Sequence, residues 1–126
     1  MHRDFAPATY LMANRKNGAL YCGATSHLMR RVYQHRTGET GGHSRRYDIR
    51  RLVWFEMHAT MEQAIGREKR IKKWNRNWKI QLIEQNNPQW RDLAVDLGFP
   101  PLPSASVTTR SVREMDSRVR GNDDSE

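Results

Sequence analysis

Apolar residues occur first in short runs and later at helical intervals along the chain. Residues 9–13 and 19–22 are short apolar runs on either side of a polar segment that contains Asn17-Gly18. Two such runs around an Asn-Gly turn are typical of a β-hairpin. Residues 51–56 form a third run, rich in strand-forming side chains, which predicts a third strand. The three strands can share one small antiparallel sheet.

The first helical pattern follows the hairpin. Thr25-Ser26 offers an N-cap, and the pattern continues until Thr37-Gly38 ends it. The segment 38–44 is polar and rich in glycine, so we expect a loop there.

A second and longer helix begins at Thr60, where Gln63 completes a capping-box pattern. It continues past Trp74 and is expected to bend or break over 75–77, after which an apolar pattern resumes over 78–83. The residue before Pro88 resists helical geometry, so this helix stops near there. A last short helix is expected over 89–97.

The domain organisation follows from these elements. The 126 residues suffice for one domain, which we place at 8–97 and assign to the α+β class. Residues 1–7 are a short extension, and 98–126 are a proline-containing linker and tail. From residue 104 onward the chain is polar, mixed in charge and without aromatic residues, so we expect this tail to be disordered and without function.

Composition and charge indicate the class of partner and the cellular compartment. Residues 1–103 carry 18 basic and 9 acidic side chains, an excess that favours a nucleic-acid partner over a basic protein with none. No apolar run is long enough for a membrane span, and no signal peptide is visible, so we expect a cytoplasmic protein without a membrane role. The single cysteine, Cys22, fits a reducing compartment and is expected to be a small buried residue.

Two cation-capable residues lie on the apolar stripe of the first helix. Leu28, Arg31, Val32 and His35 are spaced so that they share one face. Core packing does not require Arg31 or His35 there. The alternative is structural, with Arg31 reaching past the stripe to water and His35 capping the helix end.

A single carboxylate breaks the apolar stripe of the second helix. Glu68 lies in line with Ala64, Ile65 and Ile71, so it is expected to face inward. A buried carboxylate needs a cation or a metal ion beside it. The alternative to a metal site is a buried ion pair between Glu68 and Arg31.

The hairpin adds two phenols, Tyr10 and Tyr21, which alone would indicate ordinary packing. Together with an arginine, a histidine and one inward glutamate in a basic domain, they suggest phosphodiester hydrolysis. That reaction needs a base for water, a cation for the phosphate and a carboxylate for a divalent ion.

At this point the chain resembles the GIY-YIG nuclease superfamily, which includes the N-terminal nuclease domain of a bacterial excinuclease, certain phage homing endonucleases and small stand-alone bacterial proteins. The match is closest to the stand-alone group and covers about residues 8–97. Its order and spacing are specific, although each motif alone is weak. The matching segments are 8–10, 21–23, 28–35, 66–74 and 87–93. The resemblance implies a three-stranded antiparallel sheet flanked by helices.

The resemblance also implies roles for the aligned residues. Tyr21 would help to deprotonate the attacking water, and Tyr10 would position water or phosphate. Arg31, rather than its neighbour Arg30, matches the catalytic arginine, and His35 matches a histidine that assists the tyrosine in some members.

The remaining implied roles concern metal and support. Glu68 would hold one Mg²⁺ or Mn²⁺ ion, with no organic cofactor. Asn87 would support the site, and Gly23 would allow close packing. The chain departs from the family at Ala8-Thr9, Cys22 and Ala24, which are packing positions or, at Ala24, the place of a lysine in some repair members.

DNA contacts are expected from basic residues on both sides of the third strand: Arg45, Arg46, Lys69, Lys72 and Lys73. Trp74, Trp78 and Trp90 can stack on bases, but their helical spacing favours core packing. We expect a monomer or a weak dimer.

Two rival interpretations remain. The first is a nucleic-acid-binding module of the same fold that does not cleave. The second is a structural or adaptor protein in which Arg31 and Glu68 form a buried pair.

Overall fold

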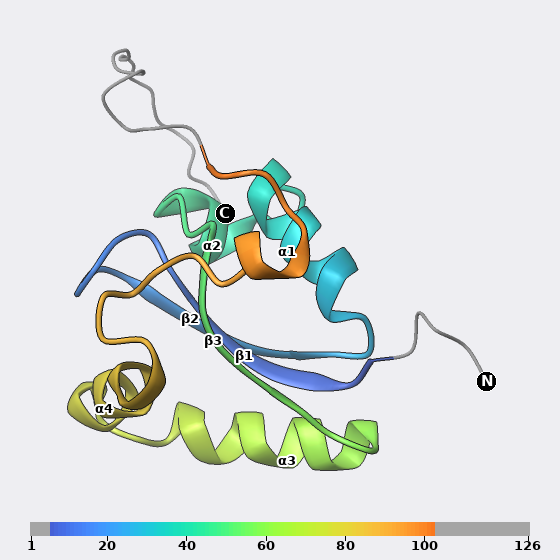
Figure 1. Cartoon of the computed structure of the whole chain (residues 1–126). Helices are drawn as coiled ribbons and strands as arrows, with labels where there is room; N and C mark the ends of the chain where they lie inside the picture. Colours follow the sequence, from blue (N-terminus) through green and yellow to red (C-terminus); the bar gives the residue numbers. More distant parts are fainter. Residues whose placement is uncertain (1–5, 103–126) are drawn as a thin grey trace.

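The computed structural model describes residues 6–102, which form a three-stranded antiparallel sheet with helices on both faces (Figure 1). The strands are β1 (Ala8–Ala13), β2 (Leu20–Thr25) and β3 (Arg51–Met57), in the order β2-β1-β3. The α+β class and the antiparallel sheet predicted from the sequence are confirmed. The disorder expected from residue 104 onward concerns residues outside the described range.

β1 is the central strand, and its six residues are all buried. Because side chains alternate across a strand, Tyr10 and Met12 face one side of the sheet while Leu11 and Ala13 face the other. The chain turns from β1 to β2 with Asn17 in the left-handed region, at φ 59°. Both faces of β1 therefore need a covering layer.

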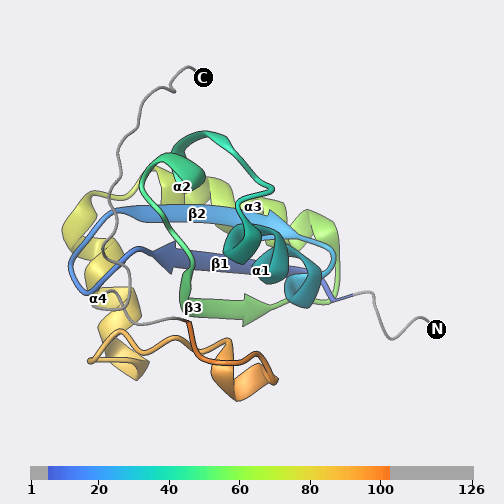
Figure 2. The same cartoon turned by 90° about the horizontal axis from the view of Figure 1, so that it is seen from above.

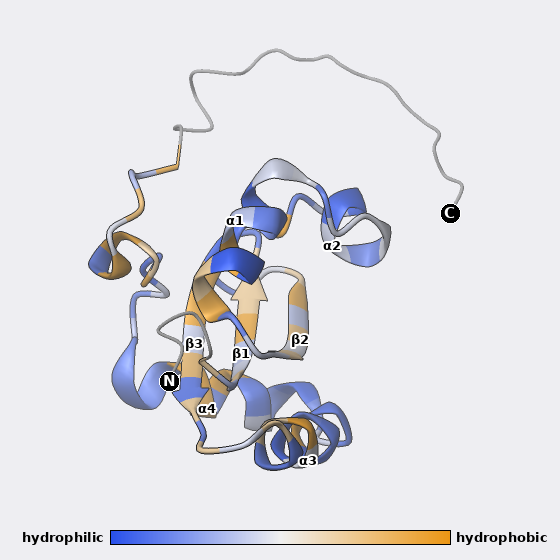
Figure 3. Ribbon diagram, turned by 90° about the vertical axis from the view of Figure 1, so that its right-hand side faces the viewer, coloured by the Kyte–Doolittle hydropathy of each residue, from blue (hydrophilic) through white to orange (hydrophobic). Residues whose placement is uncertain are grey.

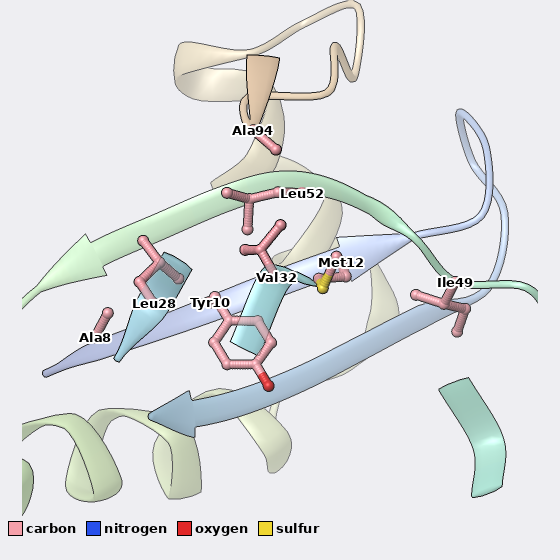
Figure 4. Close-up of a cluster of buried hydrophobic side chains, with 8 residues drawn as sticks. All are labelled: Ala8, Tyr10, Met12, Leu28, Val32, Ile49, Leu52 and Ala94. Carbon is pink, nitrogen blue, oxygen red and sulfur yellow. The ribbon is translucent and has the colours of Figure 1, made fainter. Parts of the chain in front are cut away.

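The helix α1 (Leu28–Thr37) covers the first face. Its Leu28 and Val32 pack against Tyr10, Met12 and Leu52, as Figure 4 shows. The helix ends at Gly38 in the left-handed conformation, as the sequence predicts. It begins after His27 rather than at an N-cap on Thr25-Ser26. There the Thr25 hydroxyl accepts a hydrogen bond from the His27 amide at 3.0 Å.

The helices α3 (Met61–Lys72) and α4 (Arg76–Asn86) cover the second face. The Thr60 hydroxyl accepts from the Gln63 amide at 3.2 Å, as the capping pattern predicts. The expected break over 75–77 occurs at Asn75, whose side chain caps α4 by accepting from the Trp78 amide. The buried anchors of this layer are Ile71, Ile83 and Trp90, which cluster with Leu11 and Trp54.

The two outer strands have different surroundings. Residues 87–102 run along β3, where the Leu93 amide donates to the Leu52 carbonyl at 2.7 Å (Figure 2). Among the described residues no further strand pairs with β2, and this strand is flanked by the short helix α2 (Gly42–Arg46) and by α3 (Figure 3). β2 is therefore the edge of the sheet at which the helices of both faces border solvent.

Two sequence predictions are wrong. The expected loop over 38–44 contains the start of α2, which begins at Gly42 after Gly41 has turned the chain at φ 62°. The expected helix over 89–97 is reduced to one 3-10 turn, η1 (Val95–Leu97). Trp90 has φ 57° and is fully buried, and its indole N–H donates to Glu84 at 2.7 Å. Burying this ring takes the backbone out of helical geometry.

Within the range that the structure describes, no helix combines the length and the apolar character needed to cross a membrane.

Candidate active site

Tyr10 and His35 meet under the first face of the sheet. Tyr10 comes from the central strand and His35 from the last turn of α1, and both side chains are buried. The Tyr10 hydroxyl lies 3.1 Å from Nε2 of His35. The sequence indicated both residues as candidates, and the fold places them in direct contact.

Ser44 on α2 completes a buried chain of hydrogen bonds. Its hydroxyl lies 2.7 Å from Nδ1 of His35 and donates to the Ile49 carbonyl at 3.3 Å. A hydroxyl has one proton, so Ser44 accepts from the N–H at Nδ1. Nε2 of His35 is then unprotonated and accepts from the Tyr10 hydroxyl. Sequence reasoning missed Ser44, because a serine in a glycine-rich segment carries no distinguishing signal.

Burial sets the protonation of this pair. Burial, together with the positive charge of Arg31, lowers the pKa of His35 to about 4. Burial also raises the pKa of the Tyr10 hydroxyl, and Arg31 opposes that shift without cancelling it. At neutral pH, His35 is a neutral imidazole and Tyr10 a neutral phenol. Tyr10 therefore acts as a hydrogen-bond donor rather than as a base.

Tyr21 and Arg31 stand on the solvent side of this pair. The Tyr21 ring lies 4.9 Å from the His35 ring and 6.2 Å from the Tyr10 ring, centroid to centroid. Tyr21 and Arg31 are partly exposed, whereas Arg30 is exposed. A substrate phosphate at the β2 edge can therefore reach Tyr21 and Arg31.

Gly23 gives the Tyr10 ring its place. It is paired with Tyr10 across β1 and β2, and a Cβ added to it would lie 2.5 Å from the Tyr10 hydroxyl oxygen. Figure 4 shows the Tyr10 ring directed across the sheet towards β2. A side chain at this position would displace the phenol from His35.

Glu68 on α3 approaches the same strand edge from the other layer. Its side chain is 19% exposed, and its carboxylate pairs with Lys72 at 2.7 Å. The alternative partner weighed from the sequence, Arg31, is not in contact with it among the ion pairs of the described residues. The partner is Lys72 because residues four apart share a helix face. Ile65, placed on the same inward stripe, is 39% exposed, so the buried stripe is narrower than predicted.

Side chains of α3 and β2 shift one another's pKa values at the β2 edge. Hydrogen bonding to Glu68 raises the pKa of Lys72, and Cys22 and Tyr21 add smaller shifts in the same direction. Burial raises the pKa of Cys22 to about 11, so this free cysteine is a neutral, buried thiol, as expected. Glu68 and Lys72 thus lie beside β2, the strand that carries Tyr21.

A divalent ion would have one carboxylate here. Among residues 6–102 no group of three or more histidine, cysteine or acidic side chains could hold a metal. Mg²⁺ needs hard oxygen ligands and commonly keeps several waters or takes substrate phosphates. Lys72 engages one oxygen of Glu68, Oε2, and the Glu68 side chain is partly exposed. The residues therefore fit a sparse site that is completed by substrate, and they do not fit a preformed cage.

Asn87 has a different environment from the one its predicted supporting role implied. Its amide donates to the carbonyls of Val53 and Arg91 and accepts from the Arg91 amide, at 2.9 to 3.1 Å. These contacts fasten the segment after α4 to β3. None of them reaches a side chain of the Tyr10 and His35 cluster.

The predicted DNA contacts divide between the two layers. Arg45 and Arg46 are exposed on α2, and Lys69 and Lys73 are exposed at the end of α3. Lys72 is exposed but occupied by Glu68. The helices α2 and α3, which carry or adjoin these residues, lie above and below the sheet (Figure 1).

Comparison with known families identifies the family of this chain. Residues 6–81 match the model of the GIY-YIG catalytic domain. The chain belongs to the GIY-YIG family. GIY-YIG domains are generally nucleases, so the family implies a nucleic-acid substrate.

Curated relatives of this GIY-YIG chain include proteins named UPF0213. One from Clostridium perfringens is 36% identical over 72 residues, which cover 57% of this chain and 77% of that protein. One from Haloquadratum walsbyi is 39% identical over 67 residues, covering 53% and 75%. A solution structure of a UPF0213 protein from Bacillus halodurans aligns with 24% identity and a TM-score of 0.45, over 75% of this chain and 99% of that one.

Proposed function

We propose that this GIY-YIG domain is a metal-dependent DNA endonuclease. The observation that carries the proposal is the buried chain from Tyr10 through His35 to Ser44, with Arg31 and Tyr21 on its open side. A buried histidine with a depressed pKa, held in one tautomer beside two phenols, exceeds what core packing requires.

The phenols take different roles in this proposal. Tyr10 stays protonated, and its O–H donates a hydrogen bond to Nε2 of His35. The lone pairs of the Tyr10 oxygen are therefore available to accept a hydrogen bond from a water. Tyr21, which is partly exposed, hydrogen-bonds the attacking water and, reacting as the phenolate, takes its proton and becomes a phenol. The neutral His35 fixes the position of the first phenol and packs against the second.

The charges act on the phosphate. Arg31 binds the non-bridging oxygens, where negative charge grows during attack. Glu68 would hold the divalent ion, which would supply Lewis-acid stabilisation of the leaving 3′ oxygen. Lys72 now pairs with Glu68, and release of that ion pair would leave its ammonium group available to the DNA backbone.

The DNA path follows from the exposed cations. A duplex laid along the β2 edge would contact Arg45 and Arg46 on one side and Lys69 and Lys73 on the other. Such contacts to the backbone carry no sequence information, so we expect recognition of DNA structure or weak, general cutting.

The test is cleavage of branched, nicked, single-stranded and plain duplex DNA with Mg²⁺ or Mn²⁺. Glu68→Gln and Arg31→Ala should each reduce cutting by 100-fold or more, on the order of one lost electrostatic group. Arg30→Ala, an exposed neighbour of Arg31, is the matched control and should cut normally.

The contrary result is equally clear. Binding of DNA without cutting in either metal, unchanged by Glu68→Gln, would replace the nuclease by a module that only holds nucleic acid. A strong loss of stability in Glu68→Gln would instead favour a structural ion pair.

A further inference from the structure

The junction of α3 and α4 carries a groove that the nuclease site does not use. It has a volume of about 220 Å³ and is lined by Trp74, Trp78, Gln81, Leu82 and Gln85, which we term the tryptophan groove. The sequence favoured core positions for all three tryptophans of this region. Only Trp90 is fully buried, and Trp78 is 53% exposed.

The two tryptophans of the groove are arranged edge to face, with centroids 6.0 Å apart and planes at 80°. Trp74 is held in place, because the Arg67 guanidinium lies 5.5 Å from its ring and is itself bonded to Glu56 at 3.0 Å. Trp78 thus presents its indole beside a fixed aromatic wall. Exposing so large an apolar ring is costly unless something covers it.

The groove is strongly basic at its rim. Residues 69–82 include six lysine or arginine residues and no acidic residue. Arg76 is engaged with the hairpin carbonyls of Asn17 and Gly18, but Lys69 and Lys73 are exposed at the end of α3, next to the groove in sequence. A second copy of this chain would bring the same positive charge to the contact. An anionic occupant with an aromatic face is the better complement.

The groove is also connected to the proposed active site. Trp74 and Leu82 of the groove pack against the buried cluster that contains Cys22 of β2, and α3, which carries Glu68, also contacts β2. Trp74 follows Glu68 by six residues, four within α3 and two beyond its end, so the two residues are separated by no more than about 13 Å along the helix axis. That limit is about four nucleotide steps of DNA at ~3.4 Å each.

We propose that the tryptophan groove binds an unpaired base of the DNA substrate, a few nucleotides from the phosphate that is cut. This inference rests on the proposed nuclease function and names its substrate class. In a duplex the faces of each base are covered by its neighbours, whereas an unpaired base can stack on Trp78. Gln81 and Gln85 offer amide donors and acceptors for the edge of the base. The preferred DNA therefore carries a single-stranded segment next to a duplex.

The test uses the full chain in EDTA, so that binding is measured without cutting. A short labelled oligothymidylate and a blunt duplex of equal charge are titrated by fluorescence anisotropy. Trp78→Ala should weaken binding of the oligothymidylate by about 5- to 100-fold, the range for one lost base stack, and leave the duplex unchanged. Trp78→Phe, which keeps an aromatic face, should retain most of the affinity. Met29→Ala, which removes an exposed apolar side chain from α1, is the control.

Contrary outcomes overturn the inference in distinct ways. Equal weakening of both DNAs by Trp78→Ala, or no weakening of either, would remove the base site. A change in sedimentation of Trp78→Ala without a change in DNA binding would assign the groove to a second copy of the chain.

The two experiments distinguish failure of the groove proposal from failure of the nuclease proposal. If no metal supports cutting but the oligothymidylate still depends on Trp78, the groove stands and the nuclease falls. If Glu68→Gln abolishes cutting while Trp78→Ala leaves binding of the single strand intact, the nuclease stands and the groove falls.

Discussion

His35 is a residue whose chemistry is decided by its surroundings. It is 1% exposed and lies between a phenol and a hydroxyl, and burial holds its pKa at about 4. In the unfolded chain the same imidazole titrates near 6.5. The folded protein therefore binds fewer protons than the unfolded chain between these two pH values.

This difference predicts a pH dependence of stability. The contribution of neutral His35 is fully present above about pH 6.5 and is lost as the pH falls towards 4, by roughly 3 kcal/mol in total. Urea unfolding of the natural protein and of His35→Gln, measured from pH 7.5 to 4.5, checks it. The histidine protein should lose more stability than the variant, and parallel curves would contradict the assignment.

Gly23 is the second decisive residue, because the Tyr10 hydroxyl occupies the space of its missing side chain. Gly23→Ala should cost about 1–3 kcal/mol of unfolding free energy, as overpacking of a filled core does, and should break the Tyr10–His35 hydrogen bond. Urea denaturation and the imidazole nitrogen shifts of His35 measure both effects. Gly66→Ala is the matched control. Its new methyl would meet only the Arg70 guanidinium at 3.8 Å, and it should raise stability by about 0.5–1 kcal/mol.

At the scale of elements, α2 holds the histidine by its other nitrogen. It is five residues long, yet its Ser44 is buried and lies 2.7 Å from Nδ1 of His35. The helix thus fixes which nitrogen carries the proton, and with it the direction of the hydrogen bond to Tyr10.

Ser44→Ala should therefore leave the Nδ1 proton without its closest acceptor and lower stability by about 1–3 kcal/mol. DNA cleavage should fall by about 10-fold, because the tautomer is no longer fixed. Nitrogen NMR of the imidazole should show mixed tautomers, a result that a purely structural defect would not give. Arg45→Ala, on the exposed side of the same helix, should keep one tautomer.

At the scale of the whole molecule, the two layers bring cations to one sheet edge. α2 supplies Arg45 and Arg46 and α3 supplies Lys69 and Lys73, while the β3 edge is covered by the segment after α4. We therefore place the proposed DNA path along β2, between the cations of the two layers.

A salt titration of duplex binding tests this arrangement. The double variant Arg45→Ala/Arg46→Ala should reduce the slope of log K against log salt by about 2, close to one unit for each phosphate that is no longer neutralised. Arg91→Ala, which removes a charge paired with Asp96 on the opposite side, should leave the slope unchanged. Equal effects of the two variants would show that only net charge matters.

Much of the architecture was predictable from local signals. The short apolar runs of β1 and β3, the cap at Thr60 and the stop at Gly38 depend on residues close in sequence, so pattern alone located them. α2 and the backbone at Trp90 were not predictable. The first is fixed by a contact with α1 and the second by burial of an indole between α4 and β3.

The same division holds for the site. The sequence by itself determined the candidates Tyr10, Tyr21, Arg31 and Glu68, because polar groups on apolar stripes and the family motifs mark them. Only the tertiary structure decided that His35 bonds to Tyr10 and Ser44, that Glu68 pairs with Lys72 and that Trp78 faces solvent. The physical reason is that protonation, ion pairing and exposure depend on neighbours in space, which residue spacing along one chain does not specify.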